Sequence, residues 1–213
     1  MTNFITGLKR FCKHILSFWK ITEFPNIDKT ARIDPSVKVY NPNNLIMEEN
    51  TNIDHGAVLM NTRAKIIIKK NSGAAFGLVA VTGNHMSVVG KNLKQVSDRI
   101  KDELDVNHEM DKDIIVEEDV WMGNHVTLLS GVKIGRGSEI GAGSVVRSNI
   151  PPYAVVIGNP AKIVGFRFTP EEIVEHEKVQ YDESERISKD KLDKNYEKYF
   201  LNRMKEVKQI TKL

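Results

Sequence analysis

A six-residue hydrophobic repeat restricts the possible folds of this chain more than any other feature. Every sixth residue over one long stretch is aliphatic or methionine: Val116, Met122, Leu128, Ile134, Ile140 and Val146. The residue four places after each of these is small or β-branched, and glycine follows directly at positions 123, 135 and 141. An α-helix repeats every 3.6 residues and a half-buried strand every two, so neither element by itself produces this period.

The repeat predicts a triangular β-coil in which each six-residue unit forms one short flat face. The aliphatic and small residues point inward, and the corner glycine tolerates a backbone conformation that other residues avoid. Stacked coils pair their backbones in parallel and bury a continuous apolar column. Ordinary strands with a chance period are the alternative, and six consecutive matches argue against them.

The same period is present earlier in the chain, with interruptions. Three groups of residues keep the spacing of six: Ile27, Ile33, Val39 and Leu45; Ile53 and Leu59; and Ile68, Ala74 and Ala80. We interpret the changes of phase between the groups as corners that bulge or carry insertions. The sequence therefore predicts a mainly β coil domain over residues 21–168.

The repeat stops at His85 and resumes about thirty residues later. Counted from Ala80, His85 is the sixth residue of its unit and lies at a corner, whereas the next inward position in register is Val116. Residues 86–115 are rich in charged side chains and cannot join an apolar column, so they are predicted to leave the coil as a structureless loop. A loop of this length in a compact domain is usually functional.

Composition narrows the class of protein. The 213 residues, 40% hydrophobic and 28% charged, suit one globular domain with an appendage, and a net charge of +3 is too small to indicate nucleic-acid binding. Cys12 is the single cysteine, which excludes an internal disulfide and a cysteine metal cluster. No apolar run reaches the ~20 residues of a membrane-spanning helix. We expect a cytoplasmic protein.

Residues 1–20 predict an amphipathic helix with basic residues beside its apolar stripe. The stripe consists of Phe4, Leu8, Phe11, Cys12, Ile15 and Phe18. The interrupted apolar core and the lack of a cleavage site argue against a secretory signal. Such a helix can lie on a membrane surface, but packing of the stripe onto the rest of the protein is the favoured interpretation.

Residues 169–213 predict a helical extension. Thr169, Pro170 and Glu172 mark a helix start, because threonine caps the helix, proline suits its first turn and glutamate completes a capping box. A second helix is expected from about Ser188, with an apolar stripe of Leu192, Tyr196, Tyr199, Phe200, Met204 and Val207. We expect this extension to close the end of the coil, whose free strand edge would promote aggregation.

Two segments of the chain resemble the hexapeptide-repeat acyltransferases. They read VWMGNHVTLLSGVKIGRGSEIGAGSVV (residues 120–146) and NIPPYAVVIGNPAKIV (residues 149–164), and the resemblance extends over roughly residues 27–168. It is strongest to the branch of maltose, galactoside and polysaccharide O-acetyltransferases, with the xenobiotic acetyltransferases nearby. The motifs are specific for the fold, fairly specific for acetyl-CoA use and weak for the acceptor.

The resemblance implies a left-handed parallel β-helix, acetyl-CoA as co-substrate, no metal and a homotrimer with active sites between subunits. It also implies that the inserted loop 86–115 covers a cleft at the subunit boundary and that His85 is the catalytic base. The residue suits this role, because imidazole titrates near neutral pH. It can take a proton from an attacking hydroxyl and return it to the leaving thiolate.

The resemblance further suggests where the two substrates bind. The acceptor positions are Asp54, His55 and Asn84. The coenzyme A positions are Trp121, Gly123, Asn124 and Ala142 along the slot for the pantetheine arm, and Arg147, Lys162 and Arg167 near the phosphates. The family often has a basic residue three places after Lys162; this chain has Gly165 there, so Arg167 is the suggested replacement.

The remaining titratable candidates receive lesser roles. A further group must hold the imidazole of His85 in one tautomer; Glu109 and a backbone carbonyl are the candidates, and spacing within an insertion does not decide between them. Ordinary surface or flanking positions are expected for the other histidines, namely His14, His108, His125 and His176.

The expected function is acetyl transfer to a hydroxyl of a saccharide-type acceptor. N-acetyl transfer to an amino sugar and acetylation of a xenobiotic remain open. A zinc enzyme like the γ-type carbonic anhydrases is disfavoured, since His85 has no partner histidine at the short spacing such a site uses. A non-catalytic β-helix scaffold is disfavoured by the histidine at the root of a long insertion.

Overall fold

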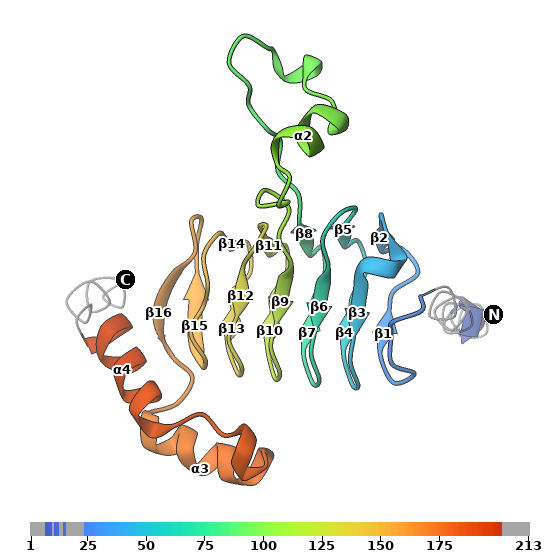
Figure 1. The fold of residues 1–213 in the computed structure, drawn as a ribbon. Helices are drawn as coiled ribbons and strands as arrows, with labels where there is room; N and C mark the ends of the chain where they lie inside the picture. Colours follow the sequence, from blue (N-terminus) through green and yellow to red (C-terminus); the bar gives the residue numbers. More distant parts are fainter. Residues whose placement is uncertain (1–6, 10, 13–14, 16–23, 202–213) are drawn as a thin grey trace.

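The computed structural model describes residues 24–201, together with residues 7–9, 11, 12 and 15. Its short strands wind into a three-faced coil, and each face is one sheet (Figure 1). The first sheet contains β1 (Arg32–Ile33), β4 (Asn52–Ile53), β7 (Gly73–Ala74), β10 (Trp121–Met122), β13 (Glu139–Ile140), β15 (Ala154–Ile157) and β16 (Lys162–Phe166). The second contains β2 (Lys38–Val39), β5 (Val58–Met60), β8 (Val79–Val81), β11 (Thr127–Leu128) and β14 (Val145–Val146). The third contains β3 (Leu45–Met47), β6 (Ile66–Ile68), β9 (Ile114–Val116) and β12 (Lys133–Ile134).

The six-residue repeat places one large inward residue on each face in turn, with a small inward residue near the corner. From β1 to β14 the chain visits the three sheets in rotation, and neighbouring strands in each sheet pair in parallel. In the first sheet the inward column in register is Ile33, Ile53, Ala74, Met122, Ile140 and Val156. All the large and small inward residues predicted between Val116 and Ile150 are buried, with 6% exposure or less. The predicted β-coil is therefore confirmed.

The early changes of phase have two structural causes. Strand β3 directs both Leu45 and Met47 inward, and β6 does the same with Ile66 and Ile68, so a face of the third sheet carries two inward residues instead of one. One further residue is accommodated at the corner between Leu59 and Ile66. The expectation that bulging corners explain every change of phase was wrong for the third sheet.

Residues 83–113 leave the coil between β8 and β9 as a projecting arm (Figure 1). The arm contains the 3₁₀ turn η2 (Leu93–Gln95) and helix α2 (Asp98–Leu104), so the expectation of a structureless loop was wrong. Ser97 caps α2 through its hydroxyl, a helix-start signal that the sequence contains. The departure also ends before residue 115, because Ile114 belongs to β9 and is fully buried.

The carboxyl-terminal extension contains α3 (Pro170–Gln180), the 3₁₀ turn η3 (Glu183–Glu185) and α4 (Lys189–Tyr199). The predicted capping box is present: Thr169 N donates to Glu172 Oε2 over 2.9 Å, and Glu172 N donates to Thr169 Oγ1 over 3.3 Å. Strand β16 pairs antiparallel with β15, and α4 lies against β16. The predicted stripe residues Met204 and Val207 lie outside the described residues.

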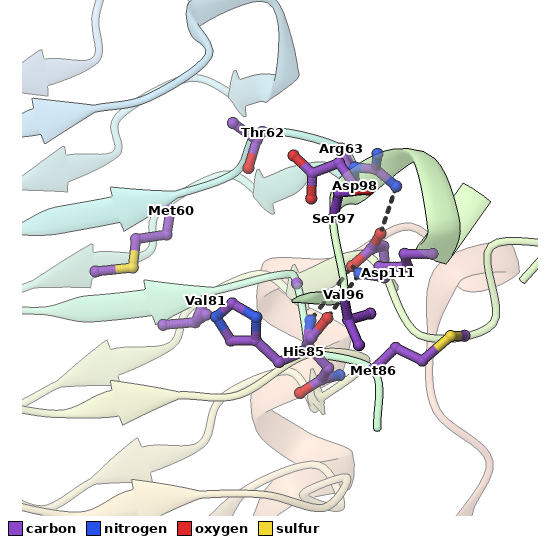
Figure 2. A pocket seen from close by; sticks show the side chains of 13 residues that line it. Met60, Thr62, Arg63, Val81, His85, Met86, Val96, Ser97, Asp98 and Asp111 are labelled. Carbon is purple, nitrogen blue, oxygen red and sulfur yellow. Dashed lines mark hydrogen bonds and ion pairs between the residues drawn. The ribbon is translucent and has the colours of Figure 1, made fainter. Parts of the chain in front are cut away.

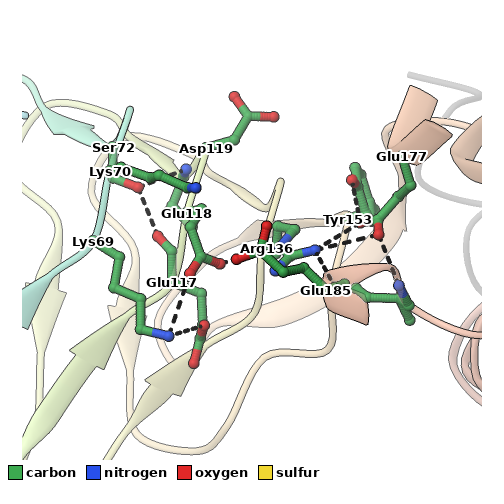
Figure 3. A network of polar contacts seen from close by, with 12 residues as sticks. Lys69, Lys70, Ser72, Glu117, Glu118, Asp119, Arg136, Tyr153, Glu177 and Glu185 are labelled. Atoms are coloured by element: carbon green, nitrogen blue, oxygen red, sulfur yellow. Dashed lines mark hydrogen bonds and ion pairs between the residues drawn. The ribbon is translucent and has the colours of Figure 1, made fainter. Parts of the chain in front are cut away.

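A network of charged groups docks the extension on the coil (Figure 3). Arg136, at a coil corner, donates to Glu118 over 3.1 Å and to Glu177 of α3 over 3.2 Å, and its guanidinium lies 3.9 Å from the ring centroid of Tyr181. Glu177 is 1% exposed and also accepts a hydrogen bond from Tyr153. The extension is thus held by hydrogen-bonded charges as well as by apolar packing.

Most of the predicted amino-terminal helix, residues 1–20, lies outside the described residues. Residues 7–9, 11, 12 and 15 are helical. Their apolar side chains Leu8, Phe11 and Ile15 are exposed, so these three do not show the expected packing onto the chain. Within the part of the chain that is described, no helix has the length and apolar character to cross a membrane.

Candidate active site

A pocket of about 650 Å³ lies where the arm leaves the coil. Its walls come from β5 and the following corner, from the end of β8, from the root of the arm and from α2. His85 lines this pocket with an exposed side chain. Figure 2 shows the imidazole on the side of Met60 and Val81, with Arg63, Asp98 and Asp111 on the opposite side. The pocket therefore combines an apolar wall, a charged wall and an exposed imidazole.

The backbone holds both ends of the arm at one residue of the coil. The carbonyl oxygen of Thr82 accepts hydrogen bonds from Lys112 N over 3.1 Å and from the Ser130 hydroxyl over 2.7 Å. Ser130 Oγ in turn accepts from Lys112 N over 3.0 Å. The chain therefore turns away from the column directly after β8, and residue 85 is carried outward at the rim of the coil.

A different corner, between the first and second sheets, holds the predicted acceptor residues Asp54 and His55. Both are exposed. On successive coils at this corner, the ring centroid of His55 lies 4.4 Å from that of Phe76, which lies 4.5 Å from that of His125. Of the predicted acceptor residues, only Asn84 lines the pocket of His85.

The same corner holds most of the predicted coenzyme A residues. Asn124 O accepts a hydrogen bond from Gly143 N over 2.8 Å, so the two turns stack directly. A Cβ at Gly123 would stand 2.8 Å from Ala142 N, which leaves no room for a side chain there. Lys162 follows the last turn at this corner and is exposed. The second sheet separates this edge of small residues from His85 within one chain.

Residues 113–148 match the family model described as bacterial transferase hexapeptide (six repeats). This segment of the chain carries the hexapeptide repeats that the family model describes. The coil of the chain is the left-handed parallel β-helix that the resemblance implied, with helices added at the carboxyl end.

Three proteins to which the chain is similar are acetyltransferases by name. A probable macrolide acetyltransferase from Lysinibacillus sphaericus is 44% identical over 61 residues, which are 29% of this chain and 34% of that protein. A chloramphenicol acetyltransferase from Klebsiella aerogenes is 48% identical over 59 residues, which are 28% of each chain. The chain therefore spans about a third of the length of these curated relatives.

The third relative is a solved structure. A hexapeptide-repeat-containing acetyltransferase from Vibrio cholerae has a TM-score of 0.54 and 25% sequence identity, over 66% of this chain and 72% of that chain. The Vibrio cholerae protein is also known complexed with acetyl coenzyme A, in a structure with 24% identity to this chain.

Of the remaining predicted cofactor residues, Trp121 lies on the strand that leads to Gly123, whereas Arg147 and Arg167 lie at other corners. Trp121 points outward from the first sheet between Gly73 and Glu139 and is 51% exposed. Arg147 is exposed and follows the second sheet, as His85 does. Arg167 lies at a third corner, away from Lys162. There it forms an ion pair of 2.7 Å with Asp119, so its charge is already paired within the chain.

Glu109 does not hold the imidazole of His85. Its carboxylate forms an ion pair of 2.8 Å with Lys112 and is exposed. His108 also lies in the arm, and His176 packs in α3 between the rings of Tyr153 and Phe168. Within the residues described, no group of three or more histidine, cysteine and acidic side chains is arranged to hold a metal ion.

The sequence analysis missed the coil residues that complete the pocket, above all Arg63. Its guanidinium contacts Asp102, with one hydrogen bond of 2.8 Å, and lies 3.6 Å from Asp111. The spacing of seven between Leu59 and Ile66 was the available signal, because it marks a corner that protrudes beside the arm.

Proposed function

We propose that this hexapeptide-repeat protein transfers an acetyl group from acetyl-CoA to a hydroxyl of a saccharide-type acceptor, with His85 as the general base. One observation carries the proposal: an exposed imidazole lines the 650 Å³ pocket at the point where the charged arm interrupts the coil. The acetyltransferase relatives supply the reaction class, and the relative solved with acetyl coenzyme A supplies the co-substrate.

The chemistry needs one base and one oxyanion donor. The imidazole of His85 takes the proton of the acceptor hydroxyl as its oxygen attacks the thioester carbonyl carbon. The tetrahedral intermediate collapses with cleavage of the carbon–sulfur bond, and the imidazolium returns the proton to the thiolate. The products are the acetyl ester and free coenzyme A. Such acid–base catalysis contributes about 10²–10⁴-fold, and a backbone N–H donor to the oxyanion about 10²–10³-fold.

The edge of Gly123, Asn124 and Ala142 suits the pantetheine arm of coenzyme A. Small residues let an extended chain lie against the backbone, whose N–H and C=O groups bind its amides. Lys162 stands exposed beyond this edge and fits a phosphate. We assign Asp54 and His55 to the acceptor side of the same edge, and Trp121 to a wall of the cleft.

A site shared between copies accounts for the separation of the two corners. His85 lies at one edge of the second sheet, whereas Gly123, Asn124, Ala142 and Lys162 lie at the other, so two chains must meet to join them. The outward face between these edges is largely apolar, with Val58, Val79 and Val145 among its residues. A homotrimer with three such interfaces is the proposed assembly, because a closed ring repeats one heterologous contact.

Acetylation of an apolar xenobiotic is the second candidate. The curated relatives are named for a macrolide and for chloramphenicol. The pocket wall formed by Met60, Val81 and Val96 would fit such an acceptor better than a sugar, because it offers apolar contact.

The test is an acceptor screen with acetyl-CoA that follows the release of free thiol. Mono- and oligosaccharides, amino sugars, chloramphenicol and a macrolide form its arms. Thiol release with a sugar hydroxyl supports the first candidate, and release with an antibiotic supports the second. Hydrolysis of acetyl-CoA at the buffer rate in every arm would contradict both.

A further inference from the structure

The buried side chains of the arm are charged. Of residues 86–113, all of which the structure describes, only Lys101, Asp105 and Asp111 are buried, with exposures of 7%, 9% and 7%. Apolar residues of the arm such as Val89 and Val106 are exposed. The arm therefore has no apolar core of its own, and its internal order depends on these three charges.

Lys101 and Asp111 converge on the residue before His85. Lys101 Nζ forms an ion pair of 2.5 Å with Asp111 Oδ1 and donates to the carbonyl oxygen of Asn84 over 2.7 Å. Asp111 Oδ1 accepts from Asn84 N over 3.3 Å, and a Cβ at Gly83 would stand 3.1 Å from the same oxygen. Both backbone groups of Asn84 are thus held by one buried ion pair.

The rest of the arm fixes that ion pair. The carboxylate of Asp105 accepts from the backbone N–H groups of Glu109 and Met110 over 2.8 and 2.9 Å, which shapes the turn leading back to Asp111. Met110 O accepts from Asn84 Nδ2 over 2.8 Å. Arg63 of the coil lies 3.6 Å from Asp111 Oδ2, so the pair is also anchored to the rigid corner.

A buried ion pair adds little net stability to a fold, because the cost of desolvating the two charges offsets much of their attraction. Apolar residues of similar size often stabilise a fold equally well. The geometric consequence of the ion pair is more specific. Residues 82–88 belong to no strand or helix, so no regular element orients His85, and the hydrogen bonds of the Asn84 backbone restrain the residue directly before it.

We propose that Lys101 and Asp111 are positioning residues that fix the Asn84 backbone and thereby aim the imidazole of His85 into the pocket. This inference rests on the proposed function only for the assignment of His85 as the base. The placement of the imidazole itself is measurable without any activity.

The experiment uses the full chain with histidine labelled at ¹³Cε1, and the His85→Ala variant assigns the resonance of His85. Lys101→Met alone leaves Asp111 buried without its partner and can unfold the arm. The informative variant is therefore Lys101→Met/Asp111→Leu, which removes both charges together. The control is Arg99→Met/Glu103→Gln, because this ion pair lies on α2, the helix that carries Lys101, but is exposed.

The double variant should keep the unfolding midpoint of the control, while the His85 resonance shifts or broadens and those of His55 and His125 stay in place. Its kcat should fall about 10²-fold with the KM for acetyl-CoA within about threefold, as expected for a misplaced base. The single variant Lys101→Arg retains Asp111 and a cationic donor beside it. Its His85 resonance should therefore lie closer to that of the wild type than the resonance of the double variant does.

An unchanged His85 resonance in a folded double variant would overturn the positioning role. Failure of the proposed function looks different: full activity in His85→Ala, or no acetyl transfer by the wild type. In either case the resonance of His85 still decides whether Lys101 and Asp111 place the ring.

Discussion

The phenol of Tyr153 donates a hydrogen bond of 2.8 Å to Oε1 of Glu177, which joins the last corner of the coil to helix α3. Glu177 is 1% exposed and also accepts from Arg136 Nη1 over 3.2 Å and from Ile187 N over 2.7 Å. One buried carboxylate therefore organises the contact between the β-helix and its extension.

Replacement of Glu177 by glutamine should loosen this contact. The change keeps the shape but removes the charge that Arg136 and Tyr153 face, and breaking a buried pair costs about 3 kcal/mol or more. Urea unfolding measures the effect. Glu175→Gln is the matched control on the same helix, because its pair with Lys178 is exposed, and it should cost less than about 0.5 kcal/mol. Equal losses in the two variants would contradict this account.

The tyrosines of the same region should lower the free energy of unfolding at high pH. Burial raises the pKa of Tyr181 to about 12 and also raises the pKa of Tyr153. Tyrosine in the unfolded chain titrates at about 10, so above that pH the unfolded state releases protons that the folded state retains, and stability decreases as pH rises. Unfolding free energies measured on both sides of about pH 10 should fall less steeply for Tyr181→Phe than for the wild type. Parallel curves would contradict the assignment.

Two corner glycines with similar backbones should differ in their tolerance of alanine. Gly137 and Gly143 have φ of +69° and +72°, so each substitution adds strain of about 1–2 kcal/mol. A Cβ at Gly143 meets nothing within 4 Å, whereas one at Gly137 collides with the buried ring of Tyr153. Thermal unfolding should therefore show a clearly larger loss for Gly137→Ala. A similar loss at both positions would mean that the Tyr153 ring moves aside at little cost.

The sequence predicted correctly the features that arise from residues close together in the chain, and it missed those that arise from contacts between distant residues. The hexad from Val116 and the Thr169 capping box are local patterns, and both reappear in the structure. His85 could be singled out because the repeat stops there. The contacts of Lys101, Asp111 and Arg63 could not, because they join residues that are distant along the chain through an arm whose path no periodicity fixes.

The separation of Arg167 from Lys162 has the same origin. The family resemblance suggested that both residues could bind a phosphate, but β16 runs across the full width of the first sheet and carries the two residues to opposite corners. Asp119, which neutralises Arg167, comes from a turn 48 residues earlier.

Mixing two inactive variants tests whether the site is shared between copies. His85→Ala removes the base at one edge of the second sheet, and Ala142→Trp fills the proposed coenzyme A edge on the other side. Chains produced together should regain activity at about a quarter of the sites in randomly mixed trimers, since some interfaces then join two intact edges. Activity no greater than that of the two variants alone, in particles that contain both chains, would place the whole site within one copy.

The central claim is that the imidazole of His85 takes the acceptor proton, and the turnover of His85→Ala tests it most directly. The control is His108→Asn, which changes an exposed histidine of the arm that does not line the pocket. We predict that thiol release from acetyl-CoA with the best acceptor falls at least about 10²-fold for His85→Ala, with an unchanged unfolding midpoint. Wild-type turnover in a folded His85→Ala protein would contradict the account.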